Sequence, residues 1–476
     1  MRVCVLQPDY STTGVDYKNY DPPRDLSSLL PGATVDHVFL NKLTTHKQIR
    51  ALGKKKYDVF VNLCEGYPDW EVPGVDVIYA LETLNLPFTG PPSRIYDLPK
   101  EVMKYVSYCE GVPTPAFRAI TEIADLEEVS SLRFPLFVKP AYAGDSLGVA
   151  RDSLVCDKAA LETKCKALLE EFDRLLVEEY IEGREFTVLV AAGVSPGTCI
   201  TYKPVEYIFP DGEAFKTYAL KTSALHPASN IPCNDATLEA ALRAASEKIF
   251  ITGGGMGYGR LDFRVNSEGE IFFLEMNLTC SVFYQDGYEG SADYVLNYDP
   301  AGKKGFLEQI INEGIARHQR KQKAYYVKGD SIAGYGIYAN RNLAAGEVIY
   351  TGEERAQRLV TRHHIDHQWN PQQQLQFRRY AYPISEEVFA LWDEDPASWA
   401  PQNHSCEANT VFEGLNVCTT RTVYAHEELT LDYATFLDPR MEPFLCNCGS
   451  KACRGMIQGP EGNTLTRREQ LRRKKD

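Results

Sequence analysis

The segments Arg260-Leu-Asp262 and Phe272-Phe-Leu-Glu275-Met-Asn277 place acidic and amide side chains inside apolar strand patterns. Because successive side chains of a strand point to opposite faces, Glu275 and Asn277 share one face. Asp262 can join them where the two strands pair. Carboxylate and amide oxygens are ligands that Mg²⁺ prefers, so these segments predict a divalent-metal site on a β-sheet.

A glycine-containing loop lies upstream of these strands. Its sequence is Phe137-Val-Lys-Pro-Ala-Tyr-Ala-Gly-Asp-Ser-Leu-Gly-Val149, with Lys139 at the end of a strand pattern and Gly144 and Gly148 in the loop. Backbone N–H groups of such a loop can approach phosphate oxygens while the lysine supplies positive charge. An ordinary surface turn after a strand has the same pattern, so the loop by itself leaves both interpretations open.

A third segment, Leu175-Leu-Val-Glu-Glu-Tyr-Ile-Glu-Gly-Arg-Glu-Phe-Thr-Val188, has two strand patterns on either side of Gly183. Its acidic residues could bind the amino group of adenine and the hydroxyls of a ribose. The alternative is a charged hairpin.

The first three hundred residues alternate short β-branched runs with helical patterns, which indicates α/β or α+β layering. A helix is expected from Asn234 or Asp235, either of which could cap it, to about Ile249. The expected strands are Val3 to Leu6, Tyr57 to Leu63, Leu136 to Lys139, Leu175 to Tyr180, Phe186 to Ala191 and Ile271 to Met276.

Taken together, these segments resemble the ATP-grasp superfamily, and within it the D-alanine–D-alanine ligases, over residues 1 to 300. Leu-Pro-Phe-Thr-Gly (86–90) comes first, followed by Lys100 and Lys104 ahead of Gly-Val-Pro-Thr-Pro (111–115), and then by the three segments above in family order. The resemblance implies an α+β multidomain protein whose ATP-grasp fold has an α/β N-terminal subdomain (1–95) and a nucleotide-binding and catalytic core of two α+β subdomains (96–300).

The resemblance also implies roles for particular residues. ATP would be bound by Lys100, Lys139, Gly144, Ser146, Glu178, Tyr180, Ile181, Glu185 and Lys221, with Glu178 and the 180–181 backbone at the adenine, Glu185 at the ribose and the lysines at the phosphates. Asp262, Glu275 and Asn277 would bind Mg²⁺. Arg260 would neutralise charge on the phosphoryl group as it passes to a carboxylate, before an amine attacks the acyl phosphate.

The part of the family pattern that selects D-alanine is different in this chain. The family's glutamate near the first glycine-rich turn has no counterpart in residues 7–14, and its loop serine aligns with Asp145. Its tyrosine after the third lysine aligns with Thr222, and its Ser-Pro-Gly stretch with residues 278–281. We therefore expect a carboxylate–amine ligase that acts on a different amino acid or peptide.

Four of the thirteen cysteines fall close to the end of the chain. Cys446-Asn-Cys448-Gly-Ser-Lys-Ala-Cys453 has a spacing that lets three thiolates bind one tetrahedral Zn²⁺, and Cys406 is the candidate for the fourth ligand. A redox role is the alternative, although the pair Cys446 and Cys448 lacks the usual CxxC spacing.

These cysteines belong to a second resemblance, to a SET domain with a post-SET cysteine motif. It rests on Ser331-Ile-Ala-Gly-Tyr-Gly-Ile-Tyr-Ala339, Asn403-His-Ser-Cys406 and Glu428-Leu-Thr-Leu-Asp-Tyr433. It implies a mainly β SET domain (327–445), a zinc motif (446–458) and methyl transfer from S-adenosylmethionine to an amine. S-adenosylmethionine would be bound by Gly334, Tyr335, Gly336, Asn403 and His404, with Tyr433 orienting the amine and Phe436 on the channel wall.

The remaining segments are expected to be connecting or terminal. Residues 301–326 are interpreted as a linker helix and 459–476 as a solvated basic tail. His363, His364 and His367 invite a metal-site interpretation, but we interpret them as a polar loop.

Net charge and hydropathy limit the partners. The net charge of −14 argues against a nucleic-acid partner, and no apolar run approaches the length of a membrane span. Because the N-terminal apolar stretch is too short for a signal peptide, we expect an intracellular, cytoplasmic protein. The oligomeric state is not predicted by the sequence.

Three functional hypotheses follow. The first is a bifunctional enzyme in which a ligase and an N-methyltransferase act on one amino acid or small peptide. The second is a protein-lysine methyltransferase whose first half binds a nucleotide or docks the substrate. The third treats both halves as binding scaffolds without catalysis.

Overall fold

The computed structural model describes residues 1–14, 21–142, 148–210, 215, 229–330, 334–352, 358–385, 387–391, 400–437 and 443–459. The chain divides into two compact units, Met1–Arg320 and Lys321–Asp476.

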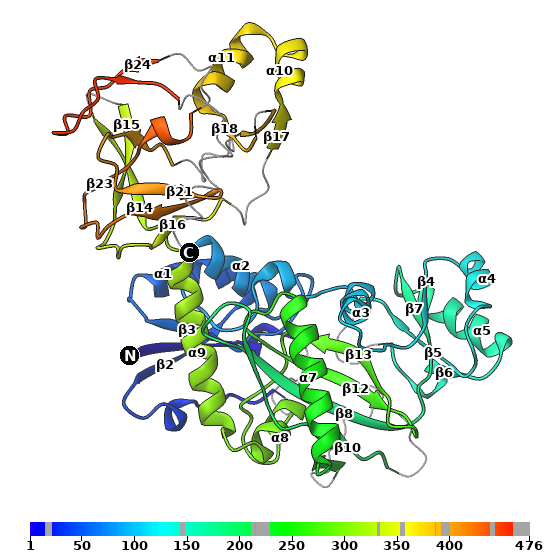
Figure 1. The fold of residues 1–476 in the computed structure, drawn as a ribbon. Coiled ribbons are helices and arrows are strands. Elements are labelled where there is room, and N and C mark those ends of the chain that lie inside the picture. Colours follow the sequence, from blue (N-terminus) through cyan, green and yellow to red (C-terminus); the bar gives the residue numbers. More distant parts are fainter. Residues whose placement is uncertain are drawn as a thin grey trace. The chain divides into compact units, whose positions relative to one another are not determined.

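The N-terminal part of the first unit has a parallel sheet with the order β2-β1-β3. Strands β2 and β3 of this sheet are drawn in blue in Figure 1. The strands are β1 (Arg2–Pro8), β2 (Thr34–Leu40) and β3 (Val59–Asn62), and the neighbouring helices are α1 (Thr45–Gly53) and α2 (Val75–Thr83). Both faces of β3 are buried, as expected for a strand of a parallel sheet covered on two sides.

A second, antiparallel sheet has the order β4-β7-β5-β6. Its strands are β4 (Phe117–Ile120), β5 (Leu136–Pro140), β6 (Leu154–Val155) and β7 (Leu175–Glu179), and its helices are α4 (Leu126–Val129) and α5 (Lys158–Leu169). Asp157 caps α5 by accepting a hydrogen bond from the Ala160 N–H. Leu161 and Leu168 of this helix are buried against Val138 and Val177 of the sheet.

A third sheet has the order β11-β10-β8-β12-β13, with β9 also paired to β8. Its strands are β8 (Arg184–Ala192), β9 (Cys199–Thr201), β10 (Val205–Tyr207), β11 (Asn230–Pro232), β12 (Tyr258–Val265) and β13 (Ile271–Asn277). Helices α3 (Lys100–Cys109) and α7 (Ala236–Thr252) pack against it. Asp235 caps α7, so the expected helix and all six expected strands are confirmed.

Two helices complete the first unit, α8 (Ser291–Tyr298) and α9 (Gly302–Lys321). Phe306 and Ile310 of α9 belong to one apolar core with Val3 and Val59 of the parallel sheet. The interpretation of this helix as a linker was therefore wrong. Its apolar side is buried in the body of the first unit, and the boundary between the units follows Arg320.

The second unit is mainly β, as predicted. Its largest sheet has the order β14-β15-β23-β21-β22-β16, with β20 paired to β23. The strands are β14 (Tyr325–Asp330), β15 (Gly334–Ala339), β16 (Val348–Tyr350), β20 (Asn403–His404), β21 (Thr410–Glu413), β22 (Asn416–Thr419) and β23 (Glu428–Leu431).

Smaller elements complete this unit. They are the strands β17 (Arg358–Thr361), β18 (Tyr382–Pro383), β19 (Val388–Leu391), β24 (Phe444–Leu445) and β25 (Met456–Ile457) and the helices α10 (Arg362–Gln368) and α11 (Pro371–Tyr380). The three histidines interpreted as a polar loop lie on α10, whose first turn is capped by the Thr361 hydroxyl. That interpretation was wrong because the cap and the buried Ile365 hold the segment as a helix.

Within the part of the chain that the structure describes, no helix is both long and apolar enough to cross a membrane.

Candidate active sites

The first unit contains a pocket where side chains from α3 and from two of its sheets meet. Strands β5, β7, β8, β12 and β13 supply most of the lining. The lining residues are Lys100, Pro115, Phe137, Lys139, Pro140, Val149, Glu178, Glu179, Tyr180, Ile181, Glu185, Phe215, Arg260, Asp262, Arg264, Leu274 and Glu275.

Ion pairs between lysines and glutamates lie on one side of the pocket. Glu178 on β7 is held by two lysines, with the Lys139 Nζ 2.7 Å from Oε1 and the Lys104 Nζ 2.8 Å from Oε2. The Lys100 Nζ lies 3.4 Å from Oε2 of Glu275. Although burial by itself raises the pKa of Glu178, the two lysines together lower it below its usual value, so this carboxylate is ionised.

Aromatic rings line another part of the same pocket. The rings of Phe137 and Phe215 meet edge to face at 4.9 Å, and the Tyr180 ring lies 6.4 Å from each of them. Flat apolar surfaces of this kind suit a planar base, while the lysines suit phosphates. The lining thus combines the two kinds of surface that a nucleoside polyphosphate requires.

Arg264 on β12 fixes the chain between β7 and β8. Its guanidinium donates to the Tyr180 hydroxyl at 2.9 Å and to the carbonyl oxygens of Ile181 and Gly183 at 3.3 Å. It also pairs with Oε2 of Glu185 at 3.1 Å. Gly183 is required here because a Cβ at its φ of +147° would lie 2.1 Å from the Val265 carbonyl oxygen.

The predicted metal ligands face one another across β12 and β13. In the strand register Asp262 lies opposite Glu275, and Arg260 opposite Asn277. The Arg260 guanidinium pairs with both Asp262 oxygens at 3.0 and 3.1 Å, and the Asn277 amide lies 3.3 Å from Oδ2 of Asp262. This oxygen-rich donor set fits Mg²⁺.

The structure brings together most of the residues predicted for this site. Lys100, Lys139, Glu178, Tyr180, Ile181, Glu185, Arg260, Asp262 and Glu275 all line the pocket, and Asn277 contacts it through Asp262. Gly144, Ser146 and Lys221 lie outside the described residues. Their ligand-binding roles remain predictions.

Arg264, Phe137 and Phe215 line the pocket but were not among the site residues expected from the sequence. Arg264 lies two residues after Asp262, so strand alternation could have placed it on the same face. Phe137 lies two residues before Lys139 on β5, so the same alternation could have placed it on that face. Phe215 has no such signal, because its contact with Phe137 depends on packing between distant segments.

The second unit holds a polar cluster formed by residues of β15, β20 and β23 and by the segment that follows β23. Asn403 donates from its amide nitrogen to Oε1 of Glu428 at 2.8 Å. Both groups lie against Gly336, where a Cβ would be 2.5 Å from the Glu428 oxygen. The backbone N–H of Tyr433 donates to Nδ1 of His404 at 3.1 Å, and burial lowers the pKa of His404.

Aromatic side chains surround Tyr433. Its hydroxyl donates to the Gln402 carbonyl oxygen, and its ring lies 5.5 Å from that of Phe436. Phe412 lies 5.0 Å from Phe436 and 4.6 Å from Tyr382. Phe436 was expected here from the sequence, whereas Phe412 and Tyr382, which reach the cluster from the separate strands β21 and β18, were not.

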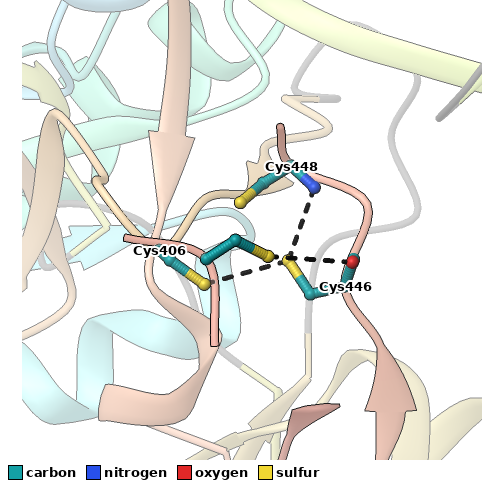
Figure 2. A group of neighbouring side chains, drawn as sticks. Cys406, Cys446 and Cys448 are labelled. Atoms are coloured by element: carbon teal, nitrogen blue, oxygen red, sulfur yellow. Dashed lines mark hydrogen bonds between the residues drawn. The ribbon is translucent and has the colours of Figure 1, made fainter. Parts of the chain in front are cut away.

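The four late cysteines converge in the second unit. One thiol sulfur from each of Cys406, Cys446, Cys448 and Cys453 lies within 4.8 Å of the others. Figure 2 shows Cys406 Sγ directed at Cys446 Sγ, at 3.8 Å. Four thiolates around a tetrahedral zinc ion with Zn–S bonds of about 2.3 Å are about 3.8 Å apart, so the donor set fits zinc.

The thiols of this cluster differ in acidity. Hydrogen bonding from the Cys406 backbone N–H lowers the pKa of Cys448 to about 5, and burial raises the pKa of Cys446 to about 12. Both shifts arise in part from hydrogen bonds among the cysteines themselves, which reflects how closely the four groups lie.

Two family models match separate parts of the chain. The model of the D-ala D-ala ligase C-terminus matches residues 109–282, and the model of the SET domain matches residues 334–434.

Related proteins match the first unit. The D-alanine–D-alanine ligase of Idiomarina loihiensis is 31% identical over 239 residues, which is 48% of this chain and 72% of that protein. The ligase of Laribacter hongkongensis is 32% identical over 202 residues, or 42% of this chain. The match spans 62% of the Laribacter protein, which is less than two thirds of its length.

A solved structure has the same fold. D-alanyl-alanine synthetase A from Vibrio cholerae matches with a TM-score of 0.50 and 19% sequence identity, covering 66% of this chain and 98% of the other. The ATP-grasp fold of the first unit is thus shared. The chain belongs to the D-alanine–D-alanine ligase family through its first unit, and it carries a SET domain in its second.

Proposed function

We propose that this chain is a bifunctional enzyme, an ATP-dependent carboxylate–amine ligase joined to an S-adenosylmethionine-dependent amine N-methyltransferase. The observation that carries the ligase half is the single pocket in which lysines, an aromatic lining and the Asp262–Glu275 pair meet. The residue set around Tyr433 and the SET match support the methyltransferase half.

The ligase half would bind ATP with its phosphates toward Lys100 and Lys139 and its base between Phe137 and Tyr180. Mg²⁺ held by Asp262, Glu275 and Asn277 would neutralise phosphate charge. The γ-phosphoryl group passes to a carboxylate oxygen and ADP leaves. The amine nitrogen then attacks the acyl carbon and phosphate leaves, while Arg260 stabilises the negative charge that develops.

The methyltransferase half would bind S-adenosylmethionine against Gly336, Asn403 and His404. The amine attacks the methyl carbon in line with the sulfur, and S-adenosylhomocysteine leaves. Tyr433 orients the amine, and the aromatic cluster of Tyr382, Phe412 and Phe436 excludes water around it.

The cysteine cluster would bind a structural Zn²⁺. A site in which all four positions are thiolates has no open coordination position for catalysis. Its contribution is to hold the loop that contains Cys446 against the segment that contains Cys406.

The substrate would be an amino acid or small peptide other than D-alanine. The chain departs from the D-alanine pattern at residues 7–14, at Asp145 and at residues 278–281, whereas the nucleotide side of the site is retained. One metabolite could then be both ligated and methylated by one chain. We also propose a cytoplasmic location and no nucleic-acid or membrane partner, in keeping with the net charge of −14.

Mass spectrometry of products tests this proposal. The full chain is incubated with amino-acid and peptide pools, ATP, Mg²⁺ and S-adenosylmethionine, beside Lys139→Ala and Tyr433→Phe. We expect a ligated product that needs Lys139 and a methylated product that needs Tyr433. Methyl groups found only on added protein, with no ADP formed, would instead establish a protein-lysine methyltransferase with a docking module.

A further inference from the structure

Besides Lys100 and Lys139, which line the nucleotide pocket, a third lysine lies buried next to it. Lys104 on α3 is fully buried and does not line the pocket. Its Nζ lies 2.8 Å from Oε2 of Glu178 and donates to Oγ1 of Thr114 at 3.0 Å. Thr114 in turn donates to the Phe273 carbonyl oxygen at 2.9 Å, so the ammonium group has a fixed position.

Glu178 is held at both ends of its carboxylate. The Lys139 ammonium group pairs with Oε1 from the pocket side, and the Lys104 ammonium group pairs with Oε2 from the interior. Without Lys104 the carboxylate would still be paired with Lys139, but Oε2 would lose the ammonium group that faces it in the interior. Lys104 therefore fixes the orientation of Glu178 and favours its ionised form.

An ionised carboxylate can only accept hydrogen bonds. Its charge state therefore determines which nucleotide base it can bind. Adenine presents an amino group, a donor, at its 6-position, whereas guanine presents an oxygen acceptor there. A fixed carboxylate attracts the first and repels the second. A protonated or rotated Glu178 would discriminate less, because a carboxylic acid can also donate.

We propose that Lys104 is a positioning residue for nucleotide selection, which acts through Glu178 to make the pocket prefer adenine over guanine nucleotides. The inference rests on the proposed function, since it takes the pocket to be the ATP site with Glu178 at the base. Lys104 itself does not contact the nucleotide.

The experiment measures the dissociation constants of ATP and GTP for the full chain by titration calorimetry, with Mg²⁺ present. Lys104→Met removes the charge, and Lys104→Arg restores it. Lys164→Met is the matched control, because Lys164 is also buried and paired, with Asp152 at 2.6 Å, on α5 and outside the pocket lining.

We expect Lys104→Met to weaken ATP binding by about 10- to 100-fold, the usual loss for a hydrogen bond to a charged group. GTP binding should be unchanged or tighter, so the ATP-to-GTP preference falls at least about tenfold. Lys104→Arg should recover part of the preference, and Lys164→Met should keep the wild-type value.

A second variant covers the case in which Lys104→Met does not fold. Thr114→Val keeps the charge but removes the hydroxyl that positions it, and we expect a drop in preference of about threefold. Equal weakening of ATP and GTP in these variants would overturn the inference and leave Lys104 a structural residue. A wild-type chain that binds neither nucleotide would overturn the proposed function itself.

Discussion

Replacing Arg264 with methionine tests how much the buried ion pair beside the pocket stabilises the first unit. The guanidinium is buried, and it joins Glu185, the Tyr180 hydroxyl and the carbonyl oxygens of Ile181 and Gly183. Arg264→Met removes the guanidinium that pairs with the buried Glu185 carboxylate. Removing one partner of a buried pair costs about 3–5 kcal/mol in the free energy of unfolding.

This cost can be converted into a melting temperature. An unfolding entropy of about 2.1 cal/mol/K per residue amounts to about 0.7 kcal/mol/K for the unit formed by residues 1–320. A loss of 3–5 kcal/mol then lowers the melting temperature of this unit by about 4–7 °C.

Scanning calorimetry measures the effect, and the transition of the first unit is the one that rises when ATP and Mg²⁺ are added to the wild type. Arg184→Met is the control. Arg184 also pairs with a glutamate, Glu206, but its side chain is 51% exposed, so its loss should cost no more than about 1 kcal/mol. Equal melting temperatures for the two variants would refute the reasoning that burial makes the Arg264 pair important.

Three further outcomes are expected in the second unit. Tyr433→Phe should lower the rate of methyl transfer at least about 100-fold, measured as S-adenosylhomocysteine formed, and should leave ADP release unchanged. Glu428→Ala frees the Asn403 amide and should weaken S-adenosylmethionine binding by about 3- to 10-fold in a calorimetric titration; an unchanged affinity would exclude this role. Cys446→Ser should reduce bound zinc, measured by plasma mass spectrometry, from about one ion per chain to a small fraction, and retention of the metal would contradict the four-thiolate site.

Local periodicity explains what could be predicted. The two-residue repeat of strands places Glu275 and Asn277 on one face, and the register of β12 and β13 then brings Asp262 opposite Glu275. Asp235 predicted the start of α7 by the chemistry of helix capping. These features depend on residues close in sequence or on one strand pair.

Long-range packing explains what was missed. The pairing of Lys104 with Glu178 requires α3, which packs on the third sheet, to bring Lys104 within reach of β7 in the second sheet, and no local pattern predicts that contact. The amphipathic pattern of α9 predicted a helix, but its burial against Val3 and Val59 depends on the whole core of the first unit. The helix around His363 had a local signal, the capping hydroxyl of Thr361, which the polar composition obscured.

The spacing of the four cysteines has a consequence for the order of folding. Three of them lie within eight consecutive residues, so a zinc ion could be captured by this short segment while the rest of the second unit is still unfolded. Cys406 lies just after β20, which reaches its place only when it pairs with β23. Binding of Cys406 as the fourth zinc ligand would then coincide with the assembly of the strands around Tyr433. In cells with little zinc, newly made chains would therefore lack a fully assembled catalytic centre in the second unit.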